Sequence, residues 1–205
     1  QQVSSAASDV YKRQVINSVA EAEDISAARA AEIVGEAKFI RGWQHFEMQK
    51  MYRTPKYVSE ANFSLDDLEA SKVPNTGKIW ANIIQDFADA AAALPATQAE
   101  VGRATKWAAL AYQAKALVYS GDYTSALPIL ENIVNNGPYT LVDKFEDNYL
   151  VATRNNSESI FEIQYAVSSA DTNASNAEIG LAHPYIAPWG CCGFLQAPQD
   201  LIDFF

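Results

Sequence analysis

The sequence has few of the residues that characterise several large classes of protein. Its 205 residues include 15 Lys and Arg against 25 Asp and Glu, which gives a net charge of −10. Because proteins bind the phosphates of nucleic acids through clustered Lys and Arg, this balance argues against a nucleic-acid partner. No apolar run in the sequence approaches the roughly 20 residues that cross a bilayer as a helix. A membrane-spanning segment is therefore not expected within it.

Residues that perform catalysis or bind metals are also scarce. The two histidines, His45 and His183, do not lie at metal-ligand spacing from one another, and His45 is expected to be a satisfied core or groove residue. The sequence contains no Gly-rich phosphate loop and no Ser or Cys nucleophile motif. Asp86 and Asp89 lie on a polar helix face, where solvated surface is expected over the acid/base pair of a glycosidase. We predict no catalytic residue, no metal site and no cofactor.

The sequence has only two cysteines, Cys191 and Cys192, and they are adjacent. Neighbouring cysteines can form a strained local disulfide, act as soft metal ligands, or be two small residues in a tight loop. A zinc site is not expected, because there is no further Cys and no nearby His. Free thiols and a local bridge both remain open.

Helical periodicity dominates the chain before Pro138. This periodicity, together with an apolar fraction of 49% and an aromatic fraction of 11% in the whole chain, indicates a folded, mainly α-helical protein. Apolar residues recur at helical spacing in residues 27–52, 78–94, 104–120 and 124–136. Gly121 separates the last two segments, since Gly takes the left-handed conformation that ends a helix. We predict tetratricopeptide-like stacked antiparallel helix pairs, forming a short α-solenoid.

The apolar stripes of these helices predict which side chains are buried. On the first helix the stripe consists of Ile33, Ala37, Ile40, Trp43 and Phe46, with Phe39 beside it. Six further side chains are expected to be buried between the helices: Trp107, Leu110, Leu117, Leu127, Leu130 and Ile133. Trp80 is assigned to the core as well. Residues 56–76 are polar and irregular and predict a long loop that is either functional or packed over a neighbour.

The character of the sequence changes after Pro138. Residues 159–165 alternate apolar and polar side chains, which predicts a short strand. Residues 183–194 are dense in Pro, Gly and aromatic side chains, and flat rings bind the C–H faces of sugars when polar groups lie close by. Trp189 and Tyr185 are therefore predicted to form a stacking platform, with His183 and Gln196 binding hydroxyls. The alternative is that these rings pack the loop onto the helices.

Both ends of the sequence differ from the rest. Residues 1–14 show neither the helical nor the strand period of apolar residues, and VSSAASDVYKRQ resembles adaptor-derived translation. These residues are therefore expected to be a non-native leader. The last residues, ending in Phe204 and Phe205, are predicted to belong to an amphipathic helix, which indicates an internal fragment of a longer protein. The predicted organisation is a leader (1–14), a helical scaffold (15–138) and a loop-rich region with short strands (139–205).

The order of segments from Val15 to Phe205 resembles a known family. The segments are GEAKFIRGWQHFEMQKMY, IWANIIQDFADAAAALP, GRATKWAALAYQAKALVYSGDYTSALPILENIV, NSESIFEIQY and APQDLIDFF. Together they resemble the SusD/RagB family of outer-membrane nutrient-binding lipoproteins of Bacteroidetes. Pro198 departs from the family pattern, in which a Ser or Thr at this position caps the helix that follows. The resemblance implies a lipid-anchored cell-surface protein whose helical scaffold docks on a TonB-dependent (SusC-like) transporter.

The expected function is binding without catalysis. We predict a non-catalytic cell-surface protein that binds a glycan or another nutrient and delivers it to the TonB-dependent transporter. The alternative is a tetratricopeptide adaptor that binds protein partners in its helical groove, and a groove without a peptide-sized apolar trough would favour the receptor. A polysaccharide-degrading enzyme is the third class, and no residue constellation supports it.

Overall fold

The computed structural model describes residues 14–19, 22–62, 69, 72–75 and 77–163, of which those up to Glu162 form one compact unit. The long helices are α2 (Ala27–Tyr52), α3 (Trp80–Ala93), α4 (Lys106–Ser120) and α5 (Tyr123–Asn136). Shorter 3-10 helices are η1 (Glu60–Asn62), η3 (Phe145–Asn148) and η4 (Val151–Thr153). The predicted mainly α-helical class is confirmed, and each long helix ends within two residues of its predicted bounds.

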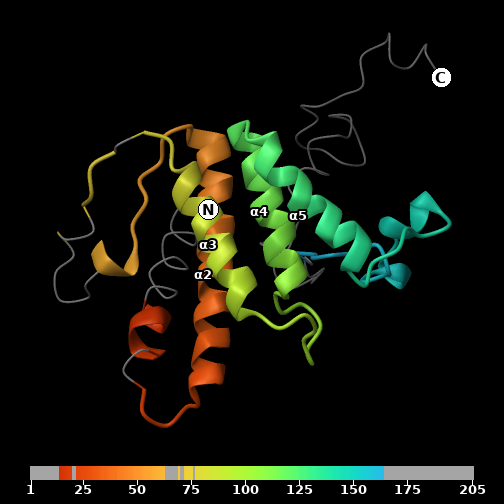
Figure 1. Ribbon diagram of the computed structural model, residues 1–205, viewed down its shortest axis with the longest axis horizontal. Helices are drawn as coiled ribbons and strands as arrows, with labels where there is room; N and C mark the ends of the chain where they lie inside the picture. The colour runs from red at the N-terminus through yellow and green to blue at the C-terminus, as the bar shows by residue number, and fades with distance from the viewer. Residues whose placement is uncertain (1–13, 20–21, 63–68, 70–71, 76, 164–205) are drawn as a thin grey trace, which may run out of the picture. The chain divides into compact units, whose positions relative to one another are not determined.

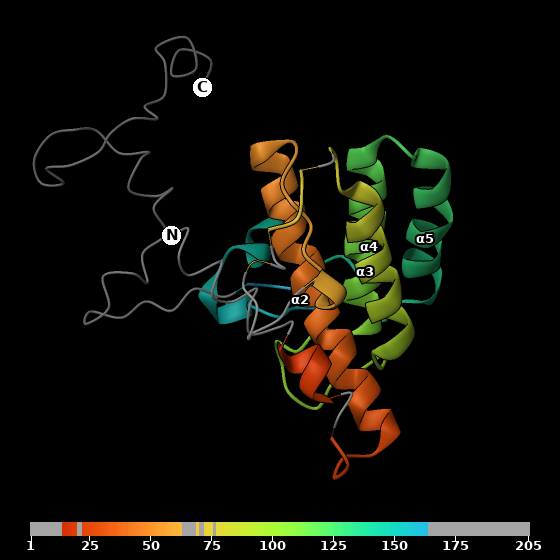
Figure 2. The ribbon, with the colours of Figure 1, turned by 90° about the vertical axis from the view of Figure 1, so that its left-hand side faces the viewer.

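The four long helices pack in chain order. Each packs against the next one, and α2 and α4 run opposite to α3 and α5 (Figures 1 and 2). Figure 2 shows α5 at the outer edge of the bundle, on the side of α4 that faces away from α2. Helices that follow one another in the chain are therefore antiparallel neighbours.

Short-range capping interactions set the helix ends. The side chains of Ser26, Thr105 and Asp122 each accept a hydrogen bond from the backbone N–H three residues on, at 3.3, 3.2 and 3.0 Å. These bonds satisfy N–H groups that have no partner within the helix. Gly121 ends α4 with φ 93°, the left-handed conformation predicted for it.

The helices α2 and α3 approach closely because α2 carries glycine where they cross. A Cβ atom on Gly35 would lie 2.9 Å from the Cβ of Ala93. A Cβ atom on Gly42 would lie 3.1 Å from a ring carbon of Phe87. Any larger side chain at either position would push α3 away.

Aromatic rings fill the space between α2, α3 and α4. The ring of Phe39 lies 5.7 Å from that of Phe87 and 5.6 Å from that of Tyr112, in edge-to-face geometry. Phe46, two turns further along α2, contacts Trp80 at 5.8 Å. Phe39, Phe46 and Phe87 are fully buried. Edge-to-face pairs of this kind stabilise by roughly 0.5–1.5 kcal/mol beyond the area they bury.

The predicted burial is right for α4. Trp107 and Leu117 are buried, and Leu110 is partly buried against the core. Ile133 of α5 is buried too, and Trp43 and Trp80 pack against the core cluster as expected.

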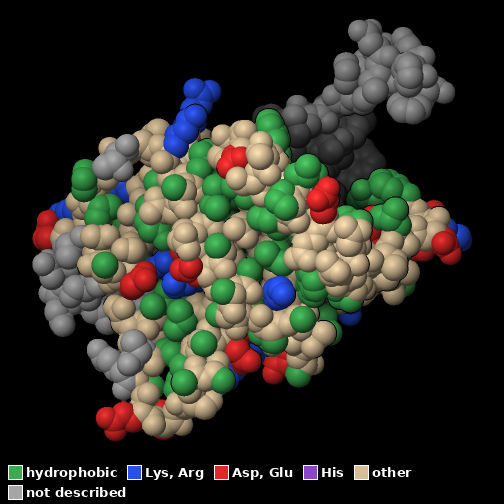
Figure 3. All heavy atoms as spheres, in the orientation of Figure 1, with side chains coloured by type: hydrophobic (Ala, Val, Ile, Leu, Met, Phe, Trp, Pro, Cys, Tyr) green, Lys and Arg blue, Asp and Glu red, His purple; other side chains and the backbone are tan. Residues whose placement is uncertain are grey.

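The predicted burial is wrong for the other face of α5. Leu127 and Leu130 are 57% and 42% exposed. The buried residues of α5 are Ala126 and Ile133, and no described helix covers its outer face. Figure 3 shows hydrophobic side chains reaching the surface over α4 and α5. A helical stripe identifies apolar residues but does not say what packs against them.

The buried face of α2 is rotated from the predicted one. Ile40 is 38% exposed, whereas the neighbouring Phe39 is 1% exposed. The close crossing with α3 places Gly35 and Gly42 toward that helix, and this rotation carries Ile40 toward the surface.

The strand predicted at residues 159–165 is not seen at 159–163, and residues 164 and 165 lie outside the described part. A strand needs a partner strand, and the described residues provide none. The ring of Phe161 instead packs 5.0 Å from Phe39 and 6.1 Å from Tyr112. A backbone hydrogen bond from Thr140 to Ser157, 2.9 Å long, holds the start of this segment.

Candidate functional site

The residues predicted to bind a ligand lie outside the described part of the structure. Trp189, Tyr185, His183 and Gln196 all follow Ile163, the last described residue. The adjacent cysteines at positions 191 and 192 do as well. The platform in this loop therefore stays a prediction, and the polar sites described below belong to the helical unit.

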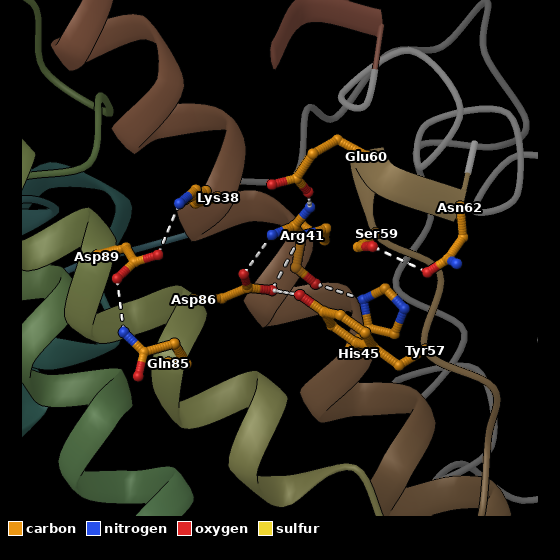
Figure 4. A network of polar contacts seen from close by, with 10 residues as sticks. All are labelled: Lys38, Arg41, His45, Tyr57, Ser59, Glu60, Asn62, Gln85, Asp86 and Asp89. Carbon is orange, nitrogen blue, oxygen red and sulfur yellow. Dashed lines mark hydrogen bonds and ion pairs between the residues drawn. The ribbon is translucent and has the colours of Figure 1, made fainter. Parts of the chain in front are cut away.

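A buried ion pair joins α2 to α3 (Figure 4). Arg41 of α2 donates to Asp86 of α3 through Nε at 3.0 Å and through Nη2 at 2.5 Å. Both side chains are only 3% exposed. Arg41 also donates through Nη1 to the carboxylate of Glu60 in η1. One guanidinium group therefore connects two helices and the loop between them.

Two aromatic side chains complete this network. The hydroxyl of Tyr57 donates to Asp86 Oδ2 at 2.9 Å. The ring of Tyr57 lies 4.8 Å from the ring of His45 and 5.5 Å from the guanidinium carbon of Arg41. Nδ1 of His45 lies 2.9 Å from the carbonyl oxygen of Arg41, and since a carbonyl only accepts, Nδ1–H is the donor. His45 is 1% exposed, which confirms the expected core residue.

Burial and pairing act in opposite directions on the pKa values of this network. Burial raises the pKa of Asp86, and the hydrogen bonds from Arg41 and Tyr57 oppose that shift. Burial acts to lower the pKa of Arg41, but the hydrogen bonds and charge of Asp86 outweigh it and hold that pKa above its ordinary value. Burial and the charge of Asp86 raise the pKa of Tyr57. Arg41 is thus a fixed cation, and Tyr57 is a neutral donor.

The prediction that Asp86 is solvated is wrong. Asp86 is 2% exposed, because it lies at helical spacing from Ile83 and Ala90 on the buried face of α3. Asp89 is 35% exposed at its side chain and pairs with Lys38 at 2.6 Å. The oxygens of Asp86 are engaged by Arg41 and Tyr57, so this carboxylate fastens the fold and is not presented to a substrate.

A small pocket opens beside a second ion pair. It has a volume of about 230 Å³ and is lined by Glu36, Phe39, Ile40, Gly102, Arg103, Ala104 and Phe161. Arg103 donates to both carboxylate oxygens of Glu36, at 2.8 and 2.7 Å. Pockets for drug-sized ligands measure roughly 300–1,000 Å³. This pocket has room for one small group and not for an oligosaccharide.

The described residues contain neither a metal-binding cluster nor a membrane-spanning helix. No group of three or more His, Cys, Asp or Glu side chains among them is arranged to hold a metal ion. None of the described helices is long and apolar enough to cross a membrane.

Comparison with known proteins identifies the family. Residues 9–118, more than half of the chain, match the SusD-like family described as "Starch-binding associating with outer membrane". The chain belongs to the SusD-like family. SusD-like protein P25 of Formosa agariphila is 23% identical over 160 residues, which are 77% of this chain and 30% of that protein. The resemblance recognised in the sequence is confirmed.

Solved structures share the SusD-like fold. A SusD superfamily protein of Bacteroides vulgatus is 28% identical with a TM-score of 0.65, over 76% of this chain and 34% of that one. A SusD-like protein of Bacteroides fragilis is 27% identical with a TM-score of 0.63, over 70% of this chain and 29% of that one. Surface glycan-binding protein A of Bacteroides thetaiotaomicron, solved with laminarihexaose, is 20% identical with a TM-score of 0.63, over 75% of this chain and 32% of that one. The chain therefore spans about a third of the length of these relatives.

Proposed function

We propose that this SusD-like protein binds an oligosaccharide at the bacterial cell surface and passes it, without catalysis, to a TonB-dependent transporter. The observation that carries the proposal is the family match over residues 9–118, whose description names starch binding and association with the outer membrane. The resemblance to outer-membrane lipoproteins extends the proposal to a lipid anchor that holds the whole protein at the outer membrane.

The ligands of proteins with the same fold support an oligosaccharide. One neighbour is a laminarin-binding SusD-like protein, another was solved with a xylogluco-oligosaccharide, and a third with laminarihexaose. These three are 19 to 23% identical to this chain, so they support the class of ligand and do not select one glycan.

The proposed stacking surface is Trp189, with Tyr185 beside it and His183 and Gln196 as hydrogen-bonding groups. A proline on either side of this segment, at 184 and 188, limits its conformational freedom, so less entropy is lost on binding. Stacking is worth about 1 kcal/mol beyond the area buried, by analogy with aromatic pairs.

Calorimetric titration with laminarihexaose and a xylogluco-oligosaccharide tests the binding site. Trp189→Ala should weaken binding at least about fivefold, which is the equivalent of that stacking energy. Tyr149→Ala is the matched control, because Tyr149 is an exposed aromatic side chain of the helical unit. Equal affinities of wild type and Trp189→Ala would assign Trp189 to packing.

The absence of catalysis is tested on the same samples. Chromatography of the glycans after long incubation should show no new product. Sustained product release that is lost on substitution of one carboxylate would contradict the proposal.

The adaptor alternative is less favoured by the geometry of the helices. A tetratricopeptide adaptor binds its partner in the groove between successive helix pairs. Here Phe161 of the same chain packs against Phe39 of α2 and Tyr112 of α4, where a partner peptide would have to enter. The receptor is therefore the better supported function.

A further inference from the structure

One end of the helical unit presents an aromatic surface. It is formed where α2 and α4 finish and α3 begins, and Figure 1 shows these three helix ends at the same end of the bundle. The ring of Tyr119 lies 5.1 Å from the buried ring of Phe46 and 6.2 Å from the ring of Trp80. Tyr119 is 52% exposed, and Trp80 is half-buried. Tyr119 therefore offers ring surface to solvent while its neighbours support it from behind.

Two lysine ammonium groups flank the same rings. Nζ of Lys50 lies 4.9 Å from the ring centre of Phe46, and Nζ of Lys115 lies 5.6 Å from it. Lys115 is also 5.4 Å from the ring of Tyr112, so two rings hold its ammonium group in place. Lys115 and Tyr119 are four residues apart on α4 and therefore lie one turn apart on one face.

These cations differ in how far they are neutralised. Lys50 pairs with Glu47 at 2.7 Å. Lys115 has no carboxylate within 4.0 Å among the described residues, and the same holds for Arg53 at the end of α2 and Lys78 just before α3. Lys115, Arg53 and Lys78 therefore carry positive charge that no described carboxylate neutralises, in a protein whose net charge is −10.

We propose that this surface binds a negatively charged oligosaccharide, with a pyranose ring on Tyr119 and a carboxylate or sulfate group at Lys115. A sugar ring brings C–H groups to the face of an aromatic side chain, and an acidic sugar brings a negative charge that can pair with the ammonium group of Lys115. A neutral glycan offers that ammonium group only hydroxyl acceptors, which form weaker hydrogen bonds than a charged acceptor does. The inference rests on the proposed glycan-binding function and adds to it the sign of charge and a second contact site.

The experiment titrates the 205-residue chain with a uronic-acid hexasaccharide, a sulfated hexasaccharide and neutral laminarihexaose. Binding of at least one anionic sugar should weaken about fivefold or more in Tyr119→Ala, and about two- to fivefold in Lys115→Gln. Lys115→Arg should keep most of the affinity, and added salt should weaken the anionic sugars only. Comparison of the two anionic sugars shows whether carboxylate or sulfate is preferred.

Two control variants remove similar groups elsewhere. Lys72→Gln removes an exposed lysine that already pairs with Glu69, and Tyr149→Ala removes an exposed aromatic ring directly after η3. Neither should change binding. Equal affinities in Tyr119→Ala and wild type, or no binding of either anionic sugar while laminarihexaose binds, would overturn this inference and leave the proposed function intact. Failure of all three sugars to bind would count against both.

Discussion

Replacing Asp86 by Asn should destabilise the fold strongly, because it leaves the charge of Arg41 buried beside a neutral partner. Arg41 is 3% exposed, and its remaining carboxylate is Glu60, which is 33% exposed at its side chain. Breaking a buried pair by removing one partner costs about 3–5 kcal/mol. Each kcal/mol lowers the Tm of a domain of this size by roughly 2–4 °C, so a fall of roughly 6–20 °C is expected.

Asp89→Asn is the matched control for this change. Asp89 lies one turn further along α3 and also pairs with a cation of α2, but its side chain is 35% exposed. Exposed pairs contribute about 0.2–1 kcal/mol. Thermal and urea unfolding followed by far-UV circular dichroism measure both variants. If they lose equal stability, the argument that burial gives the Arg41–Asp86 pair its importance is wrong.

A double variant separates the charge from the contact. Arg41→Met combined with Asp86→Leu removes both charges and keeps apolar volume in their place. Replacing a whole buried pair by apolar side chains is often neutral or stabilising. The double variant should therefore be more stable than Asp86→Asn alone, although the hydroxyl of Tyr57 then loses its acceptor.

Three further predictions follow from burial, close approach and charge. Leu117→Ala should lower the free energy of unfolding, measured in urea, by about 2–5 kcal/mol. Leu127 is exposed, so Leu127→Ala should change it by no more than about 0.5 kcal/mol, and equal losses would contradict the helix arrangement. Gly35→Val should cost about 1–3 kcal/mol by the same assay, because even its Cβ meets α3, and an unchanged stability would refute the close crossing. Burial acts to raise the pKa of Glu60, but the hydrogen bond from the guanidinium of Arg41 outweighs it and holds that pKa below its ordinary value of 4.5. Ionised Glu60 therefore stabilises the fold above pH 4.5, and this contribution is lost as the pH falls through the folded-state pKa. Glu60→Gln should therefore flatten the acid side of the stability profile, and an unaltered profile would show that the pair contributes nothing.

Helix bounds could be predicted because their causes are local. The cap at Ser26 and the left-handed glycine at Gly121 act over three or four residues, and the sequence contains both partners of each interaction. The outer face of α5 could not be predicted, since the periodicity that includes Leu127 is the same whether that face is covered or not. The rotation of α2 depends on a crossing with a helix that begins more than 25 residues later in the chain.

The candidate sites were less predictable than the helices. The loop at residues 183–194 stays a prediction because it lies outside the described residues. The ion pair between Arg41 and Asp86 joins residues 45 positions apart, and no local pattern encodes that pairing. Its position could have been inferred, because Asp86 falls at the spacing of the apolar stripe of α3 and a charged group there needs a buried partner.

The loop after α2 is held by a polar flank of that helix. Arg41, His45 and Gln49 follow one another at intervals of four residues, so they lie in a row on one side of α2, and all three are buried. Arg41 and His45 contact the first half of the loop, as described above. Gln49 donates to the carbonyl of Arg53 at the start of the loop and accepts from the N–H of Ile79 at its end, at 2.8 Å.

This row explains how a largely polar loop can cover a helix with few apolar contacts beyond that of Tyr57. Buried polar groups are almost always hydrogen-bonded, so a buried polar row on a helix needs polar partners on the segments packed against it. The loop's polar composition, which marks it as irregular in the sequence, supplies those partners. Polar residues at intervals of four on an otherwise apolar helix therefore indicate a polar segment packed over the helix. Arg41 is the member of this row that contacts both neighbours, because it donates to Glu60 in the loop and to Asp86 of α3.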